Sequence, residues 1–271
     1  MRRFETYKAI SRESGFTLIE LVIVITIISI LAGIGVGFIT QSIMGFISMS
    51  RRAELVDTAE NALRRMQRDV RQALPNSIRI DGTGKILELL NTTAGGRYRG
   101  KGPGDILDLT GDDSSFDVIG QLNTAPSVGQ SVVVYNISAT GTAGNAYSGN
   151  NRTGVGAGST ATSVNLNPAF KFPLGSPFQR FFIVDEAVTY FCDTDTTART
   201  LTRYAGYTIT NPQPTSALGA GSLMADKVSA CSFTYDSGTF KRSGMVTLDL
   251  TIEEEGEQVH LLQQIHVSNA P

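Results

Sequence analysis

The chain has 271 residues and a formal net charge of −2, so its overall charge gives no reason to expect nucleic acid as a partner. It contains no tryptophan, 28 glycines and two cysteines. Two cysteines exclude a disulfide-rich scaffold and allow a single bridge in an oxidising compartment. The length allows one large domain, or one domain with an anchor.

The first fifteen residues, MRRFETYKAISRESG, hold four basic side chains and no apolar run. The apolar run begins abruptly at Phe16, and no charged residue occurs from Leu21 to Ser50. About 20 apolar residues cross a bilayer as a helix. Residues 16–50 therefore predict a single-pass transmembrane helix. The positive-inside bias places the basic leader, residues 1–15, in the cytoplasm and the remainder of the chain outside.

Glu20 is a carboxylate inside this apolar segment. Two ordinary interpretations, a secretory signal cut near Ala32 and Gly33 or an uncleaved signal anchor, leave it unexplained. Cleavage between Gly15 and Phe16 would create a charged α-amine one helical turn away, about 6 Å along the helix axis. The carboxylate would then lie near that amine, in its own or a neighbouring subunit, and near the positive end of the helix.

The stretch GFTLIELVIVITIISILAGI, residues 15–34, resembles the processing site and N-terminal helix of type IV pilins and pseudopilins. This resemblance implies that a prepilin peptidase cleaves after Gly15, that Phe16 becomes the N-methylated first residue, and that Glu20 acts in assembly. The chain departs from the pattern at Gly37, where major pilins usually have a proline.

Three glycines interrupt the apolar helix, at positions 33, 35 and 37. Each lowers helix stability by about 1 kcal/mol relative to alanine. We therefore expect the helix to bend or unwind near Gly37.

The helical pattern continues beyond the apolar segment, over residues 51–74. Apolar side chains recur there at the i, i+3 and i+4 positions that form one helical face. The members of this face are Leu55, Ala59, Ala62, Leu63, Met66, Val70 and Leu74. Pro75 should end the helix at or before Leu74. Residues 16–74 thus predict one helix of about 88 Å, whose amphipathic second part packs on a sheet.

From residue 75 onward the chain reads as strands and polar turns. The stretch MVTLDLTI, residues 245–252, alternates as a half-buried strand does, and residues 258–267 complete a hairpin with it. Further strands are expected at 180–192, 201–209 and 227–236. The predicted fold class is α+β: a long N-terminal helix packed on a C-terminal antiparallel sheet head. A Gly/Ser/Asn-rich insertion at about 136–163 is expected to be a long mobile loop.

Several residues could carry other chemistry. The stretch GGRYRGKG matches the phosphate-loop spacing G-x-x-x-x-G-K, but Gly102, Pro103 and Gly104 block the helix that such a loop requires. We expect a basic, exposed turn there. Asp193 and Asp195 are candidate calcium ligands, but the ligand set is incomplete, and aspartates are common turn formers. We expect no metal.

The remaining polar groups do not form a catalytic arrangement by sequence. His260 and His266 are the only histidines, and their spacing of six residues along one strand is too long for joint ligation. Asparagines 91, 136 and 151 begin N-x-S/T sequons, to which we assign no role. The sequence therefore predicts neither an enzyme nor a bound cofactor.

Four further stretches resemble one branch of the family, the minor pilins of the mannose-sensitive haemagglutinin (MSHA) pilus. They are GGRYRG, SPFQRFFIVDEAVTYFC, LTRYAGY and the C-terminal HVSNAP. This resemblance implies a structural subunit for pilus assembly, initiation or tip, located in the inner membrane with a periplasmic head and later in a surface pilus. The implied partners are the inner membrane, the prepilin peptidase and other minor and major pilins.

Two alternatives to this function remain open. One is a minor pseudopilin of the J kind from a type II secretion system. The other is a signal-anchored periplasmic ligand-binding domain or enzyme. The neighbouring genes would distinguish a type II secretion pseudopilin from a pilus subunit. A deep pocket lined by a group of charged side chains would favour the second alternative.

The two cysteines, Cys192 and Cys231, lie in or at the ends of predicted strands, and the topology places them in the periplasm. We therefore predict a disulfide between them. The alternative is two buried free thiols, if their Cα atoms lie more than about 7 Å apart.

Overall fold

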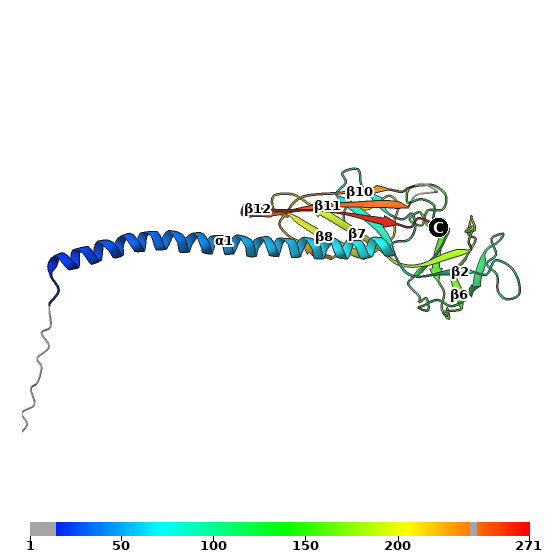
Figure 1. Cartoon of the computed structure of the whole chain (residues 1–271). Helices are drawn as coiled ribbons and strands as arrows, with labels where there is room; N and C mark the ends of the chain where they lie inside the picture. Colours follow the sequence, from blue (N-terminus) through cyan, green and yellow to red (C-terminus); the bar gives the residue numbers. More distant parts are fainter. Residues whose placement is uncertain (1–14, 239–242) are drawn as a thin grey trace, which may run out of the picture. The chain divides into compact units, whose positions relative to one another are not determined.

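The structure is a computed structural model that describes residues 15–238 and 243–271. The chain divides into two compact units, Met1–Arg51 and Arg52–Pro271. One helix, α1 (Leu18–Gln72), includes the boundary between them, and all strands belong to the second unit (Figure 1). The predicted α+β class, a long N-terminal helix followed by an antiparallel β head, is confirmed. Of the expected leader, all but Gly15 lies outside the described residues.

The first part of α1, which is the part up to residue 50, is helical without interruption through Gly33, Gly35 and Gly37. Of the two expected outcomes, a bend or an unwound segment, the unwound segment is wrong. Glycine weakens a helix, but it keeps the backbone N–H that a proline lacks, so the ladder of hydrogen bonds can continue.

The second part of α1, from residue 51 to Gln72, presents the predicted apolar face to the head. Leu55, Ala59, Ala62, Leu63, Met66 and Val70 are buried. The helix ends at Gln72, before Pro75 as expected, and the N–H of Leu74 already bonds to a strand carbonyl, that of Leu90. Asp69 is also buried within the apolar face, which the periodicity did not predict.

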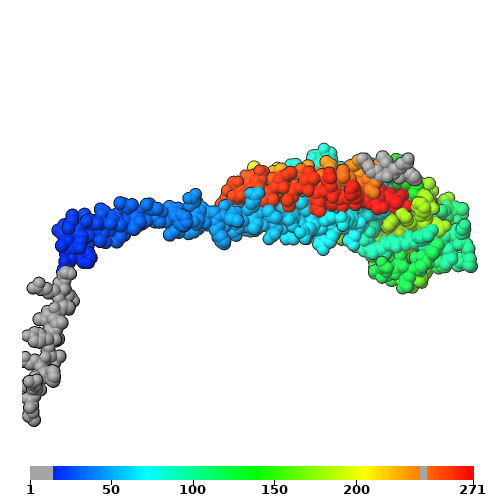
Figure 2. All heavy atoms as spheres, viewed as in Figure 1, coloured from blue at the N-terminus to red at the C-terminus, as the bar shows by residue number. Residues whose placement is uncertain are grey.

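Two antiparallel sheets pack on this part of α1, and Figure 2 shows the β11–β12 hairpin, orange to red, lying along it. In the first sheet the strands that face the helix follow the order β1-β2-β7-β8-β9, and the second has the order β10-β11-β12. Their bounds are β1 Arg79–Ile80, β2 Ile86–Tyr98, β7 Arg180–Asp193, β8 Thr200–Tyr207, β9 Gly221–Ala225, β10 Val228–Asp236, β11 Gly244–Glu254 and β12 Glu257–Val267. All five strands predicted from the sequence are confirmed within two residues.

The far ends of β2 and β7 belong to a second structure, a small closed barrel. Its pairings run β2–β3–β6–β5–β4–β7 and close through β7–β2. The added strands are β3 Asp113–Ile119, β4 Ser131–Val134, β5 Arg152–Val155 and β6 Ser163–Phe170. Figure 1 shows this barrel beyond the C-terminal end of α1. Apolar side chains such as Phe116, Phe172 and Phe181, all fully buried, form its own core.

A pair of bulges allows the same two strands to serve both cores. The β2–β7 register shifts around Thr92, so that Thr93 and Asp185 have no partner across the pair. The amide of Asn91 donates to the carboxylate of Asp185 across this point, at 2.9 Å. Bulges bend a strand and re-aim its side chains. Leu89 of β2 therefore packs towards α1, while Tyr98, at its other end, packs inside the barrel.

The polar insertion differs from the expected mobile loop. It contains β5, and both Asn136 and Asn151 are only 1 % exposed. The Asn136 amide donates to the carbonyl of Pro75 and accepts from the N–H of Ala146. Asparagine side chains can replace backbone partners in this way, so a polar, glycine-rich composition here forms a packed segment. The expectation of a loop without regular structure is wrong.

The segment GGRYRGKG is also not a simple turn. Its first four residues, Gly95 to Tyr98, belong to β2, where Gly95 to Arg97 pair with β7 and Tyr98 pairs with β3, and only the following residues leave the strand. Tyr98 is buried in the barrel core, which explains why an aromatic residue interrupts the basic stretch.

Candidate functional site

The predicted processing site lies in extended chain directly before α1. Gly15 and Phe16 precede the helix, and Phe16 is 78 % exposed. A side chain built at Gly15 would meet no atom within 4 Å. The fold of this chain therefore does not itself require glycine at position 15, which suits a requirement set by an external protein such as a protease.

Glu20 takes part in a reciprocal cap at the start of α1. Its carboxylate accepts hydrogen bonds from the backbone N–H of Thr17 at 3.1 Å and from the Thr17 hydroxyl at 3.0 Å. The Thr17 hydroxyl in turn accepts from the N–H of Glu20 at 3.3 Å. This is a capping box, in which an N-cap threonine and a glutamate three residues later satisfy each other's backbone donors.

Sequence reasoning missed this role of Glu20, although the stretch T-L-I-E carries the pattern. The box gives the carboxylate local partners at the positive end of the helix, where a negative charge is stabilised. Glu20 thus has a structural function within its own chain. Its pairing with the α-amine of a Phe16 stays a prediction, because that amine exists only after cleavage.

The first part of α1 exposes a continuous apolar surface. Every large apolar side chain from Phe16 to Met49 is at least 40 % exposed. The hydroxyls of Thr26, Ser29, Thr40 and Ser42 each bond to a carbonyl of their own helix. Internal satisfaction of polar groups is what a lipid environment requires. By length and composition α1 can cross a membrane, and no residue in its most apolar stretch is buried.

The N-terminal segment matches one family model, over residues 10–36. That model describes the prokaryotic N-terminal methylation motif. The match supports a type IV pilin-like protein. The motif implies processing by a prepilin peptidase and assembly into a membrane-associated filament, and it points to a structural subunit. The apolar helix and the motif together fit membrane anchoring.

No curated protein and no solved structure matches the chain. The family match covers Gly15, Phe16 and Glu20 and leaves the whole head outside it. What the head does must therefore be argued from its own structure.

The two cysteines lie on different sheets. Cys192 is in β7 and Cys231 in β10, and their sulfurs are bonded in the structure with the Cα atoms 6.5 Å apart. That separation is within the usual range for a disulfide. The bond links the two sheets that pack on α1.

The candidate metal ligands behave as turn residues. The Asp193 carboxylate accepts the N–H of Asp195 at 3.0 Å, as in an Asx turn between β7 and β8. Within residues 15–238 and 243–271, no three His, Cys, Asp or Glu side chains are grouped as a metal site would need. His260 contacts Asp249 on the adjacent strand at 2.9 Å, and His266 lies opposite Met245.

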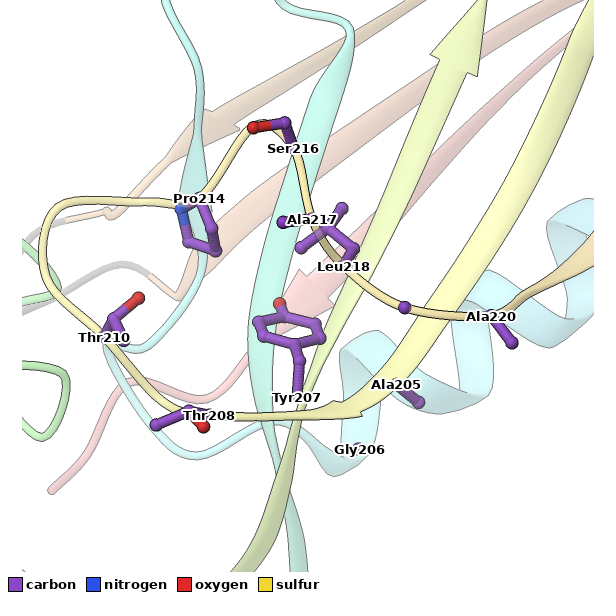
Figure 3. Close-up of a pocket in the computed structure, with 11 residues that line it drawn as sticks. Ala205, Gly206, Tyr207, Thr208, Thr210, Pro214, Ser216, Ala217, Leu218 and Ala220 are labelled. Carbon is purple, nitrogen blue, oxygen red and sulfur yellow. The ribbon is translucent and has the colours of Figure 1, made fainter.

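An open cleft of about 590 Å³ lies beneath the loop between β8 and β9. Figure 3 shows Tyr207 standing from the end of β8 towards Pro214 and Leu218 of that loop. Small and hydroxyl side chains form most of the remaining lining, and Tyr207 is its one ionisable group.

The hydroxyl of Tyr207 is already engaged. It donates to the fully buried carboxylate of Glu88 at 2.8 Å. Burial raises the pKa of Tyr207, and the Glu88 charge raises it further. Glu88 itself is paired with Arg79 at 2.6 Å, and burial raises the pKa of its carboxyl despite that partner. The cleft therefore offers no charged constellation for catalysis, and it gives no support to the enzyme alternative.

Proposed function

We propose that this chain is a minor type IV pilin, synthesised as a prepilin. In this proposal the apolar part of α1 is held in the inner membrane, with the leader in the cytoplasm and the head in the periplasm. A prepilin peptidase cleaves after Gly15 and methylates the amine of Phe16. The helix is then extracted and packs among the helices of other pilins in a surface filament.

One observation carries this proposal: an exposed Gly15–Phe16 junction stands directly before a capped helix whose large apolar side chains, as far as Met49, are each at least 40 % exposed. The exposed junction suits a protease. The apolar surface needs a partner outside the chain, which both the bilayer and a filament core provide.

The head supports a minor role, at initiation or at the tip. Its barrel is an addition carried by β2 and β7, beyond the part that packs on α1. Such an addition enlarges the surface that every neighbour would have to accommodate if the subunit repeated along a filament. A tip position meets neighbours on one side only and avoids this restriction.

The finer assignment is to an MshO-like subunit of an MSHA-type pilus. Three of the stretches that resemble that branch fall on β2, β7 and β8, which are adjacent in the sheet. The fourth, the C-terminal tail, bonds to the start of β7 through the carbonyl of Ala270 and the guanidinium of Arg180, at 3.2 Å. The four stretches are separate in the sequence but lie together in the folded head. This grouping supports a head of the same kind as in that branch.

The test is the N-terminal residue of the mature protein, measured by mass spectrometry of the membrane-extracted chain. The expected N-terminus is Phe16 carrying one N-methyl group, and Gly15→Leu should leave the leader attached. A mature chain beginning at Met1, or near Gly33, would contradict the proposal. Recovery in sheared surface filaments separates a pilus subunit from a type II secretion pseudopilin of the J kind.

A further inference from the structure

Arg97 and Arg180 lie directly opposite each other where β2 and β7 enter the barrel. Side chains at such positions stand on the same face with Cβ atoms about 4.5–5.5 Å apart, and like charges there are destabilising. In the described parts of the chain, no carboxylate lies within ion-pair distance of either guanidinium. The fold therefore brings two arginines together on one face of the β2–β7 pair, without an ion-pair partner for either among the described residues.

Both arginines are positioned by backbone carbonyls. The Nε of Arg97 donates to the carbonyl of Phe178 at 3.1 Å, and an Nη of Arg180 donates to the carbonyl of Ala270 at 3.2 Å. These bonds orient the side chains and leave further N–H groups on each guanidinium. A guanidinium presents such groups as a planar fork that matches a carboxylate.

One exposed and one half-buried phenylalanine lie next to the arginine pair, and the half-buried one, Phe182, packs against a core cluster of the head. Phe178 is 60 % exposed, and the Arg180 guanidinium lies 5.1 Å from the centre of its ring. Phe182 follows Arg180 on the same face of β7 and lies opposite Gly95. A Cβ at Gly95 would come within 3.1 Å of the Phe182 ring, so the glycine leaves room for that ring.

Asp117, on the neighbouring strand β3, is a carboxylate that could form an ion pair with Arg97 or Arg180. It is paired instead with Arg99, whose Nε lies 3.3 Å from its carboxylate. The charge of Asp117 is thus locally balanced, and the Arg97–Arg180 pair keeps its positive potential.

We propose that Arg97 and Arg180, with the exposed Phe178, form a binding site for a carboxylate-bearing sugar of an acidic polysaccharide. The two guanidinium groups hold the carboxylate, and the apolar face of the sugar ring packs on the exposed ring of Phe178. Paired cations next to an exposed aromatic ring suit a ligand that combines these two features. This site lies on the barrel and is separate from the helix surface used in filament assembly.

The experiment uses the full chain in lipid nanodiscs, immobilised for biolayer interferometry. The probes are polygalacturonate, its fully methyl-esterified form and poly-glutamate. We expect polygalacturonate to bind in a salt-sensitive manner, with both other polymers at least tenfold weaker. Arg97→Gln and Arg180→Gln should each weaken binding about tenfold, as expected for loss of a charged hydrogen-bonding partner.

Matched variants keep the test specific. Arg68→Gln removes an exposed arginine from α1 and should leave binding unchanged. Arg97→Gln should not lower the melting temperature, because it relieves a like-charge contact. Arg97→Lys keeps the charge but removes the fork, and it should also weaken binding.

Three results overturn the proposal: equal binding of the methyl ester, arginine variants that bind as the wild type does, or equal binding of poly-glutamate. The last would assign the surface to an acidic protein segment instead. None of these results affects processing at Phe16, so the failure of this site and of the pilin proposal are distinguishable.

Discussion

The two parts of α1 each carry one acidic residue on an apolar surface, and the two are satisfied in different ways. Glu20 is bonded to Thr17, three residues away in the same helix. Asp69 accepts from the Tyr190 hydroxyl and from the Arg203 guanidinium, both at 2.8 Å, from strands more than 100 residues further along. The first acid depends on local sequence, and the second depends on the folded head.

This difference follows the apolar surfaces around the two acids. The surface around Asp69 is covered by the strands of the same chain, and Met66 and Val70 beside it are fully buried. Among the described residues, no part of the chain covers the surface around Glu20, and this is the surface that we propose to contact lipid or other subunits. The same helix therefore packs on its own head in one part and exposes an apolar surface in the other.

The largest effect on stability should follow from removing the acid that depends on the head. Asp69→Ala leaves the Tyr190 hydroxyl and the Arg203 guanidinium without their acceptor, and breaking a buried ion pair costs about 3–5 kcal/mol. Tyrosine near-UV circular dichroism during urea unfolding in detergent measures this, since the chain has 8 tyrosines and no tryptophan.

The matched control is Asp57→Ala, which removes an exposed acid from the same helix. It should change the free energy of unfolding by less than about 0.5 kcal/mol. Equal effects of the two substitutions would mean that Asp69 is not a structural partner of the head.

The next effect concerns the bond between the two sheets. Cys192→Ser with Cys231→Ser should lower the free energy of unfolding by roughly 3–4 kcal/mol in the chain-entropy model, because the bridge closes a separation of 39 residues. Unfolding of the wild type with and without a reductant gives the same comparison. Two thiols that react with a maleimide in the native, non-reduced protein would contradict the bridge.

A third effect compares apolar residues on the two parts of α1. Leu63 is 4 % exposed and Ile28 is 58 % exposed. Leu63→Ala should destabilise the head by roughly 2–4 kcal/mol through a cavity, whereas Ile28→Ala should leave head unfolding unchanged. The same urea titration measures both variants. A head destabilised by Ile28→Ala would mean that the two parts of the helix are not energetically separate.

The sequence predicts those features that have a short-range pattern. The period of the apolar residues predicts α1 and its buried face, and alternation predicts strands such as β11. The barrel could not be predicted, because its closure depends on pairings between distant segments and on bulges at Thr93 and Asp185 that leave no sequence pattern. The packed insertion was missed because asparagine side chains there replace backbone partners, so its composition resembles that of a loop.

Asp69 and the arginine pair were missed for the same reason. An acid within an apolar helical face looks like an interruption of the pattern until Tyr190 and Arg203 are placed beside it. Arg97 and Arg180 are 83 positions apart, and only the β2–β7 register makes them neighbours. The capping box is different, since Thr17-x-x-Glu20 is readable from the sequence alone.

The smallest effect on stability separates the two possible roles of Glu20. Loss of an N-cap costs about 1 kcal/mol, so Thr17→Ala should slightly fray the start of α1. If Glu20 acts only within its capping box, Thr17→Ala and Glu20→Ala should impair incorporation into filaments equally. If its charge also pairs with the amine of a Phe16, Glu20→Gln should impair incorporation while Thr17→Ala is tolerated, because glutamine can still complete the box.

Sheared filaments, quantified by immunoblot against the membrane pool of each variant, provide this measurement. Cleavage after Gly15 and membrane insertion should remain intact in all three variants, because the apolar surface from Leu21 onward is unchanged. We expect Glu20→Ala to be the most impaired, Glu20→Gln intermediate and Thr17→Ala close to wild type. That order follows because the attraction between a carboxylate and an amine strengthens where helices exclude water, and an otherwise apolar surface offers little to fix axial register. Wild-type incorporation of both Glu20 variants would mean that assembly requires neither the cap nor the charge of Glu20, and it would remove the register argument.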